Sequence, residues 1–384
     1  MKPEMWHIYR QLTTLQRVRP VVIARKRENA AAFPFADVRL VPKPALHFLR
    51  RIWFKQIWRK PWTITRAETR ALRRVLFEID ARLLHIYFGH IAVLLRPLLE
   101  EWEGPCLVSF HGADVLVDME RASYRRATRE MLERVDGVLV RSESLRRAVI
   151  ALGCAAEKIE IQRTGIPLQE FAFHARPVPS NGEWRLLQAG RFIAKKGCMT
   201  TLRAFASFRR EFPQATLTFA GDGPLRAELE VATRALGLEG AVRFTGFISQ
   251  PQLRELFYAS HLFLHPSETA QDGNQEGVPN SILEAMATGL PIFATTHGGI
   301  PEAVERGGVL VEEGDSNGLA EALVTAARDT ARLAQLGQAA AEEVAAKFDQ
   351  NAQTRRLEET YLRKIKKGSM PKGQSSGVVN TGPT

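Results

Sequence analysis

The stretch SETAQDGNQEGVPNSILEAMATGLPIFATTHGGIPEAV, residues 267–304, decides the fold of the second half of the chain. A polar loop runs into an apolar helix that starts at Pro279, where the missing N–H of proline costs nothing. A short apolar run over 291–296 follows, and then a second helix led by Gly298 and Gly299. A series of strands and helices in this order is typical of a parallel sheet covered by helices on both faces.

The same alternation of β-rich runs and helical stretches extends along the chain. The runs are 19–25, 81–89, 105–112, 137–142 and 158–165 in the first half, and 184–191, 216–223, 241–247, 261–267, 291–296 and 308–314 in the second. HARPVPSNGEW, residues 174–184, separates the two series, since its Pro, Ser, Asn and Gly content marks a linker. The sequence therefore predicts an α/β protein with two tandem doubly wound (Rossmann-like) domains. We expect the ligand in the crevice at the carboxyl ends of the strands.

The two ends of the chain depart from this simple repeat. The opening MKPEMWHIYRQLTTL predicts a helix, whereas a doubly wound domain normally opens with a strand. We expect the first strand to be missing or supplied in another way. The predicted organisation is an N-terminal domain over 1–174, a linker over 175–183, a C-terminal domain over 184–345, a helix over 346–367 that returns toward the N-terminal domain, and a disordered tail over 368–384.

Composition narrows the class of protein. The chain has 384 residues, 45% of them hydrophobic and 25% charged, which is enough for two domains with separate cores. We expect no transmembrane helix, because no run of eighteen apolar residues occurs, and the N-terminus lacks a secretory pattern, which predicts a cytoplasmic location. Cys106, Cys154 and Cys198 offer neither an even disulfide framework nor C-x-x-C spacing, so we interpret them as buried or ordinary thiols.

Positive charge gathers at the start of the chain, where the first 75 residues hold 18 lysines and arginines against four acids. Such a field attracts polyanions. Residues 44–61 also show a helical pattern: Leu46, Leu49, Trp53 and Ile57 share one face, and Arg51, Lys55 and Arg59 share the opposite one. This pattern predicts an anionic membrane surface as a partner, although a helix packed on its own sheet is an alternative. We expect no nucleic acid partner, because no nucleic-acid fold signature accompanies the charge.

Two glutamates in the 267–304 stretch point to a ligand. Glu276 precedes the helix and Glu284 sits about one turn inside it. Backbone N–H groups at the helix start would form an anion site; they belong to Asn280, Ser281, Ile282 and Leu283. Two carboxylates beside a phosphate site suit a nucleotide sugar, which carries hydroxyls on both sides of a diphosphate. Stabilisation of the helix dipole is the alternative, and it explains Glu276 but not Glu284.

Cations follow the first strand of the second domain, in GRFIAKKG, residues 190–197. Arg191 and Lys196 can approach one pocket there and neutralise a diphosphate leaving group, with Lys195 the less favoured partner. The alternative is a solvated surface pair.

Two further strand ends carry candidate residues. FAGDGPLR, 219–226, places Gly221 and Gly223 in a strand-to-helix turn, where tight packing is the alternative to ligand binding. SFHGADV, 109–115, places His111 where its imidazole could reach the crevice, and a purely structural histidine is the alternative.

Together these motifs resemble those of retaining glycosyltransferases of the GT-B fold, family 4, and within it the enzymes of bacterial exopolysaccharide (colanic-acid-type) assembly. The resemblance covers roughly residues 4–362 and is strongest over 184–304. Its most specific element is E-x7-E, met by Glu276 and Glu284 and followed by EAMATGLP. GRFIAKKG, AGDGPLR, VRFTGF and GGIPEAV occur in the expected order.

The resemblance implies a role for each motif. Glu284 would bind the ribose hydroxyls, Glu276 would face the transferred sugar, and His111 would lie near its reacting end. Arg191 and Lys196 would hold the diphosphate. Further donor-site residues would be Gly221, Gly223, Asn280, Ser281, Ile282, Gly298 and Gly299, with the backbone around Phe247 and Ile248 receiving the base. The segment HIYFG keeps His85 and Gly89 but has Tyr87 where a histidine is common, and the opening strand with its glycine loop is absent.

We therefore predict a hexosyltransferase that uses UDP- or GDP-hexose and a lipid-linked saccharide or polysaccharide acceptor, with retention of configuration, at the inner face of the cytoplasmic membrane. We expect no cofactor and no metal requirement, since Arg191 and Lys196 could supply the positive charge and no Asp-x-Asp site is evident. Three alternatives remain open: a sugar-nucleotide epimerase of the same fold, a non-catalytic polyanion- or membrane-binding protein, and a degenerate family member without activity.

Overall fold

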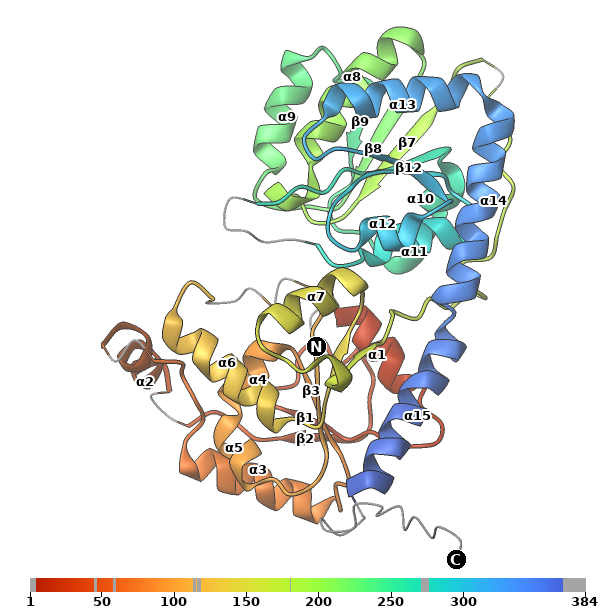
Figure 1. Cartoon of the computed structure of the whole chain (residues 1–384). Helices are drawn as coiled ribbons and strands as arrows, with labels where there is room; N and C mark the ends of the chain where they lie inside the picture. Colours follow the sequence, from red (N-terminus) through yellow and green to blue (C-terminus); the bar gives the residue numbers. More distant parts are fainter. Residues whose placement is uncertain are drawn as a thin grey trace, which may run out of the picture.

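The computed structural model describes residues 5–44, 47–57, 60–112, 115, 119–179, 181–270 and 276–368. The chain forms two α/β domains that face each other, with long C-terminal helices running along one side of both (Figure 1). Each domain contains a parallel sheet flanked by helices. The prediction of two Rossmann-like domains is thereby confirmed.

The first domain is built on a four-stranded parallel sheet in the order β3-β4-β5-β6. Its strands are β3 (Leu84–Tyr87), β4 (Cys106–Ser109), β5 (Gly137–Val140) and β6 (Ile159–Ile161). Its helices are α3 (Arg66–Glu78), α4 (Gly89–Leu94), α5 (Arg96–Glu101), α6 (Ala122–Arg134) and α7 (Glu143–Ala151), with a 3-10 turn over Ala156–Lys158. Every residue of β4 and β5 is buried, as expected for apolar strands with helices on both faces.

The start of the chain does not extend this sheet. α1 (Trp6–Thr13) occupies the segment where a helix is predicted. β1 (Val22–Ala24) pairs in parallel with β2 (Val38–Leu40) in a separate two-stranded sheet. The sequence does not reveal β2, because its side chains are mostly exposed and no apolar run marks it. α2 (His47–Ile52) continues into a π-helical turn, η2 (Trp53–Ile57), at the outer edge of the domain (Figure 1).

The second domain has a six-stranded parallel sheet in the order β12-β11-β10-β7-β8-β9. Its strands are β7 (Arg185–Ala189), β8 (Thr216–Ala220), β9 (Val242–Phe244), β10 (Leu262–His265), β11 (Ile292–Thr295) and β12 (Gly308–Val311). The chain builds outward from β7 to β9 and then returns to add β10 on the other side of β7. The pair β7 and β10 is therefore the point where strand order reverses, and ligands of open α/β sheets bind at such points.

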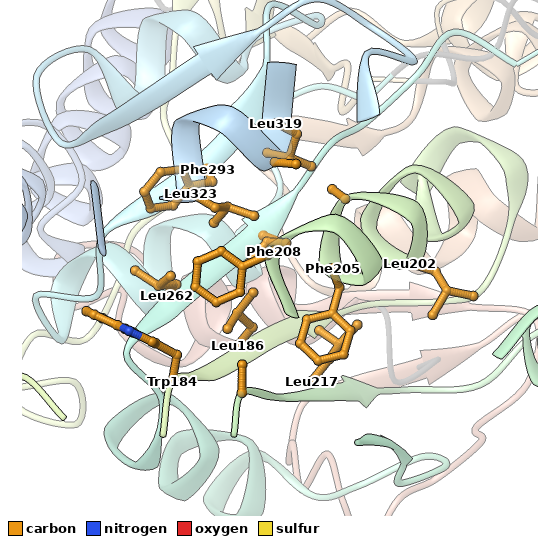
Figure 2. Packing of buried hydrophobic residues seen from close by; sticks show 14 of the residues in the cluster. Trp184, Leu186, Leu202, Phe205, Phe208, Leu217, Leu262, Phe293, Leu319 and Leu323 are labelled. Atoms are coloured by element: carbon orange, nitrogen blue, oxygen red, sulfur yellow. The ribbon is translucent and has the colours of Figure 1, made fainter. Parts of the chain in front are cut away.

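Helices cover this sheet on both faces: α8 (Cys198–Glu211), α9 (Arg226–Ala235), α10 (Gln250–Ala259), α11 (Asn280–Ala287), α12 (Ile300–Val304), α13 (Ser316–Arg328) and α14 (Thr330–Lys347), with a 3-10 turn over Ala194–Lys196. Figure 2 shows the core on one face, where Phe205 and Phe208 of α8 and Leu323 of α13 pack against strand residues such as Leu186 and Phe293. Burial of each such side chain stabilises the fold by roughly 1.5–3 kcal/mol. This core includes residues of β7 and β10, so its packing fixes the two strands from whose ends the site is built.

α15 (Gln350–Gly368) crosses back from the second domain to the first. Its Leu357 and Tyr361 pack with Leu107 and Leu139 of the first sheet. The predicted tail lies outside the described residues apart from Gly368, which ends this helix. The three cysteines are free and buried, as predicted. Among the described helices, none is long and apolar enough to cross a membrane.

Candidate active site at the crevice between the domains

The site is built where β7 and β10 end side by side. The chain leaves β7 through the segment that carries Lys195 and Lys196, and it leaves β10 toward Glu276. Oε1 of Glu276 lies 3.1 Å from Nζ of Lys195 and 3.1 Å from Nζ of Lys196, and all three side chains are at most 15% exposed. The sequence favours Lys196 over Lys195 as a partner of the diphosphate, whereas the structure gives both lysines the same contact with Glu276.

The charge on Glu276 follows from these neighbours. Burial alone raises the pKa of its carboxyl, but the attraction of Lys196 and Lys195 outweighs burial and lowers the pKa to about 2. Nζ of Lys196 also lies 3.4 Å from Nε2 of the buried His265. Burial and the charge of Lys196 hold the pKa of His265 well below its ordinary value, so this imidazole adds no charge at neutral pH.

The backbone at Glu276 is fixed by the loop that precedes α12. The N–H of Glu276 donates to Nε2 of His297 at 2.9 Å, while Nδ1 of His297 lies 2.6 Å from Oε1 of Glu313. This pattern places the imidazole proton on Nδ1, where it donates to Glu313. Gly298 has a φ of +55°, and a Cβ there would lie 2.2 Å from the carbonyl oxygen of Glu276. Gly298 therefore serves the close approach of Glu276. His297 was not identified from the sequence, although it directly precedes the two predicted glycines.

Glu284 points to a partner that the sequence analysis missed. Oε1 of Glu284 accepts a hydrogen bond from Nη1 of Arg10 at 3.0 Å, and both side chains are less than 10% exposed. Arg10 lies in α1 of the first domain, whereas Glu284 lies in α11 of the second. In the sequence, Arg10 is the one Lys, Arg, Asp or Glu residue of the segment WHIYRQLTTL, but nothing in that segment indicates that its partner is Glu284.

The start of α11 differs slightly from the expectation. Pro279 caps the helix, which begins at Asn280, one residue later than predicted. The amides of Ile282 and Leu283 donate to the carbonyl of Pro279 at 3.2 and 3.4 Å, so they are not free as expected. Oγ of Ser281 donates to the carbonyl of Ala189 at the end of β7, at 3.3 Å.

His111 belongs to the first domain and lies two residues after the end of β4. The backbone of His111 and Gly112 approaches Gly277, since a Cβ on Gly277 would lie 3.2 Å from the carbonyl oxygen of His111. The predicted histidine and Glu276 therefore follow strands of different domains and meet at one junction. Burial, with the charge of Arg141 next, holds the pKa of His111 well below its ordinary value, so its imidazole is neutral at neutral pH.

A small cavity of about 30 Å³ adjoins His111. His7 and Gln11 of α1 line it from one side, and Arg141 and Gln162 line it from the ends of β5 and β6. A volume of this size accommodates about one to three water molecules rather than a sugar ring. The N-terminal helix therefore closes the strand ends of the first domain in this structure.

The remaining predicted residues differ in their burial and contacts. Arg191 is exposed after β7. A Cβ on Gly221 or Gly223 would meet the carbonyl oxygen of Gly190 at 2.0 Å or of Phe192 at 2.5 Å, so these glycines serve packing between two loops. Two other predicted residues follow β9: Phe247 is 79% exposed, and Ile248 packs against the core. Gly299 donates its N–H to the carbonyl of Gly277 at 3.1 Å.

Two residues of the HIYFG segment are structural in character. His85 is hydrogen-bonded to Tyr361 of α15 at 2.6 Å and also contacts Ser109. Burial lowers the pKa of His85 to about 3. Tyr87 donates to Gln11 of α1 at 3.0 Å. Across the residues that the structure describes, no group of three His, Cys, Asp or Glu side chains could hold a metal ion.

Comparison with known proteins agrees with this architecture. The model of "Glycosyltransferase Family 4" matches residues 5–170, and that of "Glycosyl transferases group 1" matches 170–343. The amylovoran biosynthesis glycosyltransferase AmsK of Erwinia amylovora is 33% identical over 296 residues, which cover 75% of this chain and 71% of AmsK. The putative colanic acid biosynthesis glycosyltransferase WcaL of Escherichia coli is 30% identical over 287 residues, 73% of this chain and 70% of WcaL.

Solved structures share the fold at lower sequence identity. HepE of Anabaena, crystallised with UDP, superimposes with a TM-score of 0.76 at 21% identity, covering 94% of this chain and 96% of HepE. Sucrose-phosphate synthase of Thermosynechococcus elongatus gives a TM-score of 0.68 at 23% identity, covering 92% of this chain and 88% of the synthase. With AmsK similar over most of both sequences and with two Rossmann-like domains meeting at Glu276 and His111, this chain belongs to the family 4 glycosyltransferases of the GT-B fold.

Proposed function

We propose that this glycosyltransferase moves a hexose from UDP- or GDP-hexose to a lipid-linked saccharide or polysaccharide acceptor, with retention of configuration, in cell-surface polysaccharide synthesis. The observation that carries the proposal is the buried cluster of Glu276, Lys195 and Lys196 at the reversal of strand order. The names of AmsK and WcaL, both exopolysaccharide enzymes, support the pathway class. The UDP and UDP-glucose complexes of HepE support a nucleotide sugar as donor.

The electrostatics of the cluster suit departure of a nucleoside diphosphate. Charge develops on the leaving phosphate as the sugar bond breaks, and fixed cations stabilise it most in a site that excludes water. Lys195 and Lys196 are fixed by Glu276, so they need little reorganisation to contact a phosphate. Arg191, exposed at the rim, would complete the contact from the solvent side. With these cations in place, we propose that the reaction requires no metal ion and no cofactor.

The sugar would lie between Glu276 and His111. Glu276 is ionised, so its carboxylate can accept hydrogen bonds from sugar hydroxyls. His111 is neutral and can donate one hydrogen bond and accept another. Glu284 would bind the ribose hydroxyls one helical turn into α11, and the backbone around Phe247 and Ile248 would receive the base.

The acceptor and the membrane belong to the same proposal. Phe48, Ile52, Trp53 and Ile57 of α2 and η2 are each about half exposed, between 47% and 57%. Arg50 and Arg51 lie on the same segment, where they contact the rings of Phe54 and Trp62. Leu46 and Arg59 of the predicted stripe lie outside the described residues. Exposed aromatic and aliphatic side chains beside arginines suit an anionic headgroup layer, where a lipid-linked acceptor would be found.

Binding calorimetry tests the donor site directly. UDP, GDP and their hexose conjugates would be titrated into the wild type, Glu284→Gln and Arg191→Ala. We expect one nucleotide to bind tightly and both substitutions to weaken it, while Arg234→Ala, an exposed arginine on α9, leaves binding unchanged. A folded wild type that binds none of these ligands would contradict the proposal. Turnover of the bound donor without acceptor would instead favour the epimerase.

A further inference from the structure

We propose that Arg10 is a positioning residue of the donor site, whose guanidinium orients Glu284 to accept both ribose hydroxyls of a nucleoside diphosphate sugar. The proposal rests on the function proposed above. It assigns a task to a residue of the first domain beside a ribose-binding carboxylate, Glu284, that belongs to the second.

Two contacts of α1 with α11 fix the geometry. Nη1 of Arg10 bonds Oε1 of Glu284 at 3.0 Å, and one turn earlier Nδ1 of His7 lies 3.3 Å from Nδ2 of Asn280. His7 and Arg10 are three apart on α1, while Asn280 and Glu284 are four apart on α11, so each pair shares one helical face. The start of α11 therefore rests directly on α1 of the first domain.

The end of α1 and the residues that follow it are in turn held to α15. Oγ1 of Thr14 lies 2.9 Å from Oγ1 of Thr354, and the carboxylate of Glu358 accepts the N–H groups of Gln16 and Arg17 at 2.6 and 2.5 Å. Glu358 is only 2% exposed. Arg10 is thus presented by an anchored helix rather than by a loop, and rigid support of this kind keeps a functional side chain in place.

The guanidinium has donor capacity left for a ligand. Nη1 bonds one oxygen of Glu284, while the buried Nη2 has no hydrogen-bond acceptor in the part of the chain that the structure describes. Oε2 of Glu170 lies 3.7 Å from Nη2, beyond hydrogen-bond distance. Buried donors are almost always satisfied, so a donor left open beside the predicted ribose carboxylate points to a ligand oxygen.

Arg10 also determines the charge of Glu284. Burial raises the pKa of Glu284, Arg10 opposes this rise, and Glu170 adds to it. A carboxylate can accept from two ribose hydroxyls at once, whereas a protonated acid must use one oxygen as a donor. Without Arg10, Glu284 would lose both its orientation and part of its ionisation.

The experiment must distinguish this positioning role from a purely structural contact between the two domains. UDP and GDP would be titrated into the wild type, Arg10→Gln, Arg10→Lys and Arg17→Gln, each beside the 2′,3′-dideoxy nucleotide that lacks both ribose hydroxyls. Arg17→Gln is the matched control, since its side chain is exposed and only its backbone N–H contacts Glu358. Circular dichroism and melting would check the fold of each variant.

We expect Arg10→Gln to weaken the ribonucleotide about tenfold or more, the scale of a hydrogen bond to a charged group, while the dideoxy nucleotide changes little. Arg10→Lys should recover part of the loss, and Arg17→Gln should match the wild type. The ribonucleotide affinity of Arg10→Gln should rise with pH as Glu284 ionises, with Glu170 the remaining acid that faces it. The wild-type affinity should depend less on pH.

Three results would overturn the inference. Equal weakening of ribo- and dideoxy nucleotides by Arg10→Gln would mean a structural role, and unchanged binding would mean none, with the proposed function intact in both cases. A wild type that binds no nucleotide would remove the proposed function and this inference together. If Arg10→Gln does not fold, Arg10→Gln with Glu284→Gln removes both buried charges; its discrimination for ribose should not exceed that of Glu284→Gln alone, and a greater discrimination would overturn the inference.

Discussion

The ammonium group of Lys195 forms an ion pair with Glu276, with Nζ 3.1 Å from Oε1. The sequence favours Lys196 over Lys195 as a partner of the diphosphate, whereas in the structure Lys196 makes the same contact with Glu276 at the same distance as Lys195. Two cations that share one carboxylate leave a net positive charge at the end of β7. Such a charge would attract an anion, as the proposed donor site requires.

We predict that both lysines bind the diphosphate. Lys195→Met and Lys196→Met should each weaken UDP or GDP by about tenfold, since each removes one charge-assisted contact. Binding of the nucleoside without phosphates should not change, and calorimetry compares the two. Lys26→Met, at a lysine 74% exposed in the first domain, is the control and should bind like the wild type. A loss confined to Lys196→Met would show that Lys195 only fixes Glu276.

Replacement of Glu276 by Gln should reduce kcat at least about a hundredfold, since it removes the charged acceptor proposed to face the sugar. It should also change acid stability. The lowered pKa means that ionised Glu276 stabilises the fold above about pH 4.5, and this stability is lost as pH falls toward 2. Urea unfolding at pH 7 and pH 3 should show a smaller acid-dependent loss for Glu276→Gln. Equal acid-dependent losses of stability in the wild type and in Glu276→Gln would contradict a stabilising role for these ion pairs.

Gly298→Ala should disrupt the site more than it disrupts the fold elsewhere. A Cβ at Gly298 would lie 2.2 Å from the carbonyl oxygen of Glu276, and its φ of +55° strains any side chain. Gly237 offers a matched control, because its φ is +66° and nothing lies within 4 Å of its Cβ position. We expect Gly237→Ala to lower the free energy of unfolding by about 1 kcal/mol through strain alone. Gly298→Ala should lower it further and abolish donor binding, measured by urea unfolding and calorimetry.

The second domain could be predicted from sequence because its signals are local. Apolar runs, glycine turns and the E-x7-E spacing each act within a few residues, so the doubly wound fold and the position of Glu276 before the helix could be predicted. Lys195 could not be separated from Lys196, because a 3-10 turn brings both ammonium groups to one carboxylate. The amides of Ile282 and Leu283 were expected to be free, and only the cap at Pro279 shows where they bond.

The first domain was harder to predict because its decisive contacts are distant in sequence. Arg10 and Glu284 are 274 residues apart, and no periodicity links a helix of one domain to a helix of the other. β2, a short and mostly exposed run, likewise pairs only with β1, outside the main sheet. Tertiary contacts of this kind depend on how the domains face each other, which local patterns do not encode.

The exposed side chains of α2 and η2 lead to a prediction about membranes. The wild type should sediment with vesicles that contain an anionic phospholipid, and do so less at high salt, because each lysine or arginine near the surface contributes about 1 kcal/mol that salt screens. Trp53→Ser with Ile57→Ser should reduce this binding several-fold, since both side chains are at least half exposed and available for insertion. Phe77→Ser is the control, because Phe77 is 87% exposed on α3, outside the segment. Failure of the wild type to bind anionic vesicles at low salt would contradict the membrane proposal, and an equal effect of Phe77→Ser would assign the binding to general surface apolarity rather than to α2 and η2.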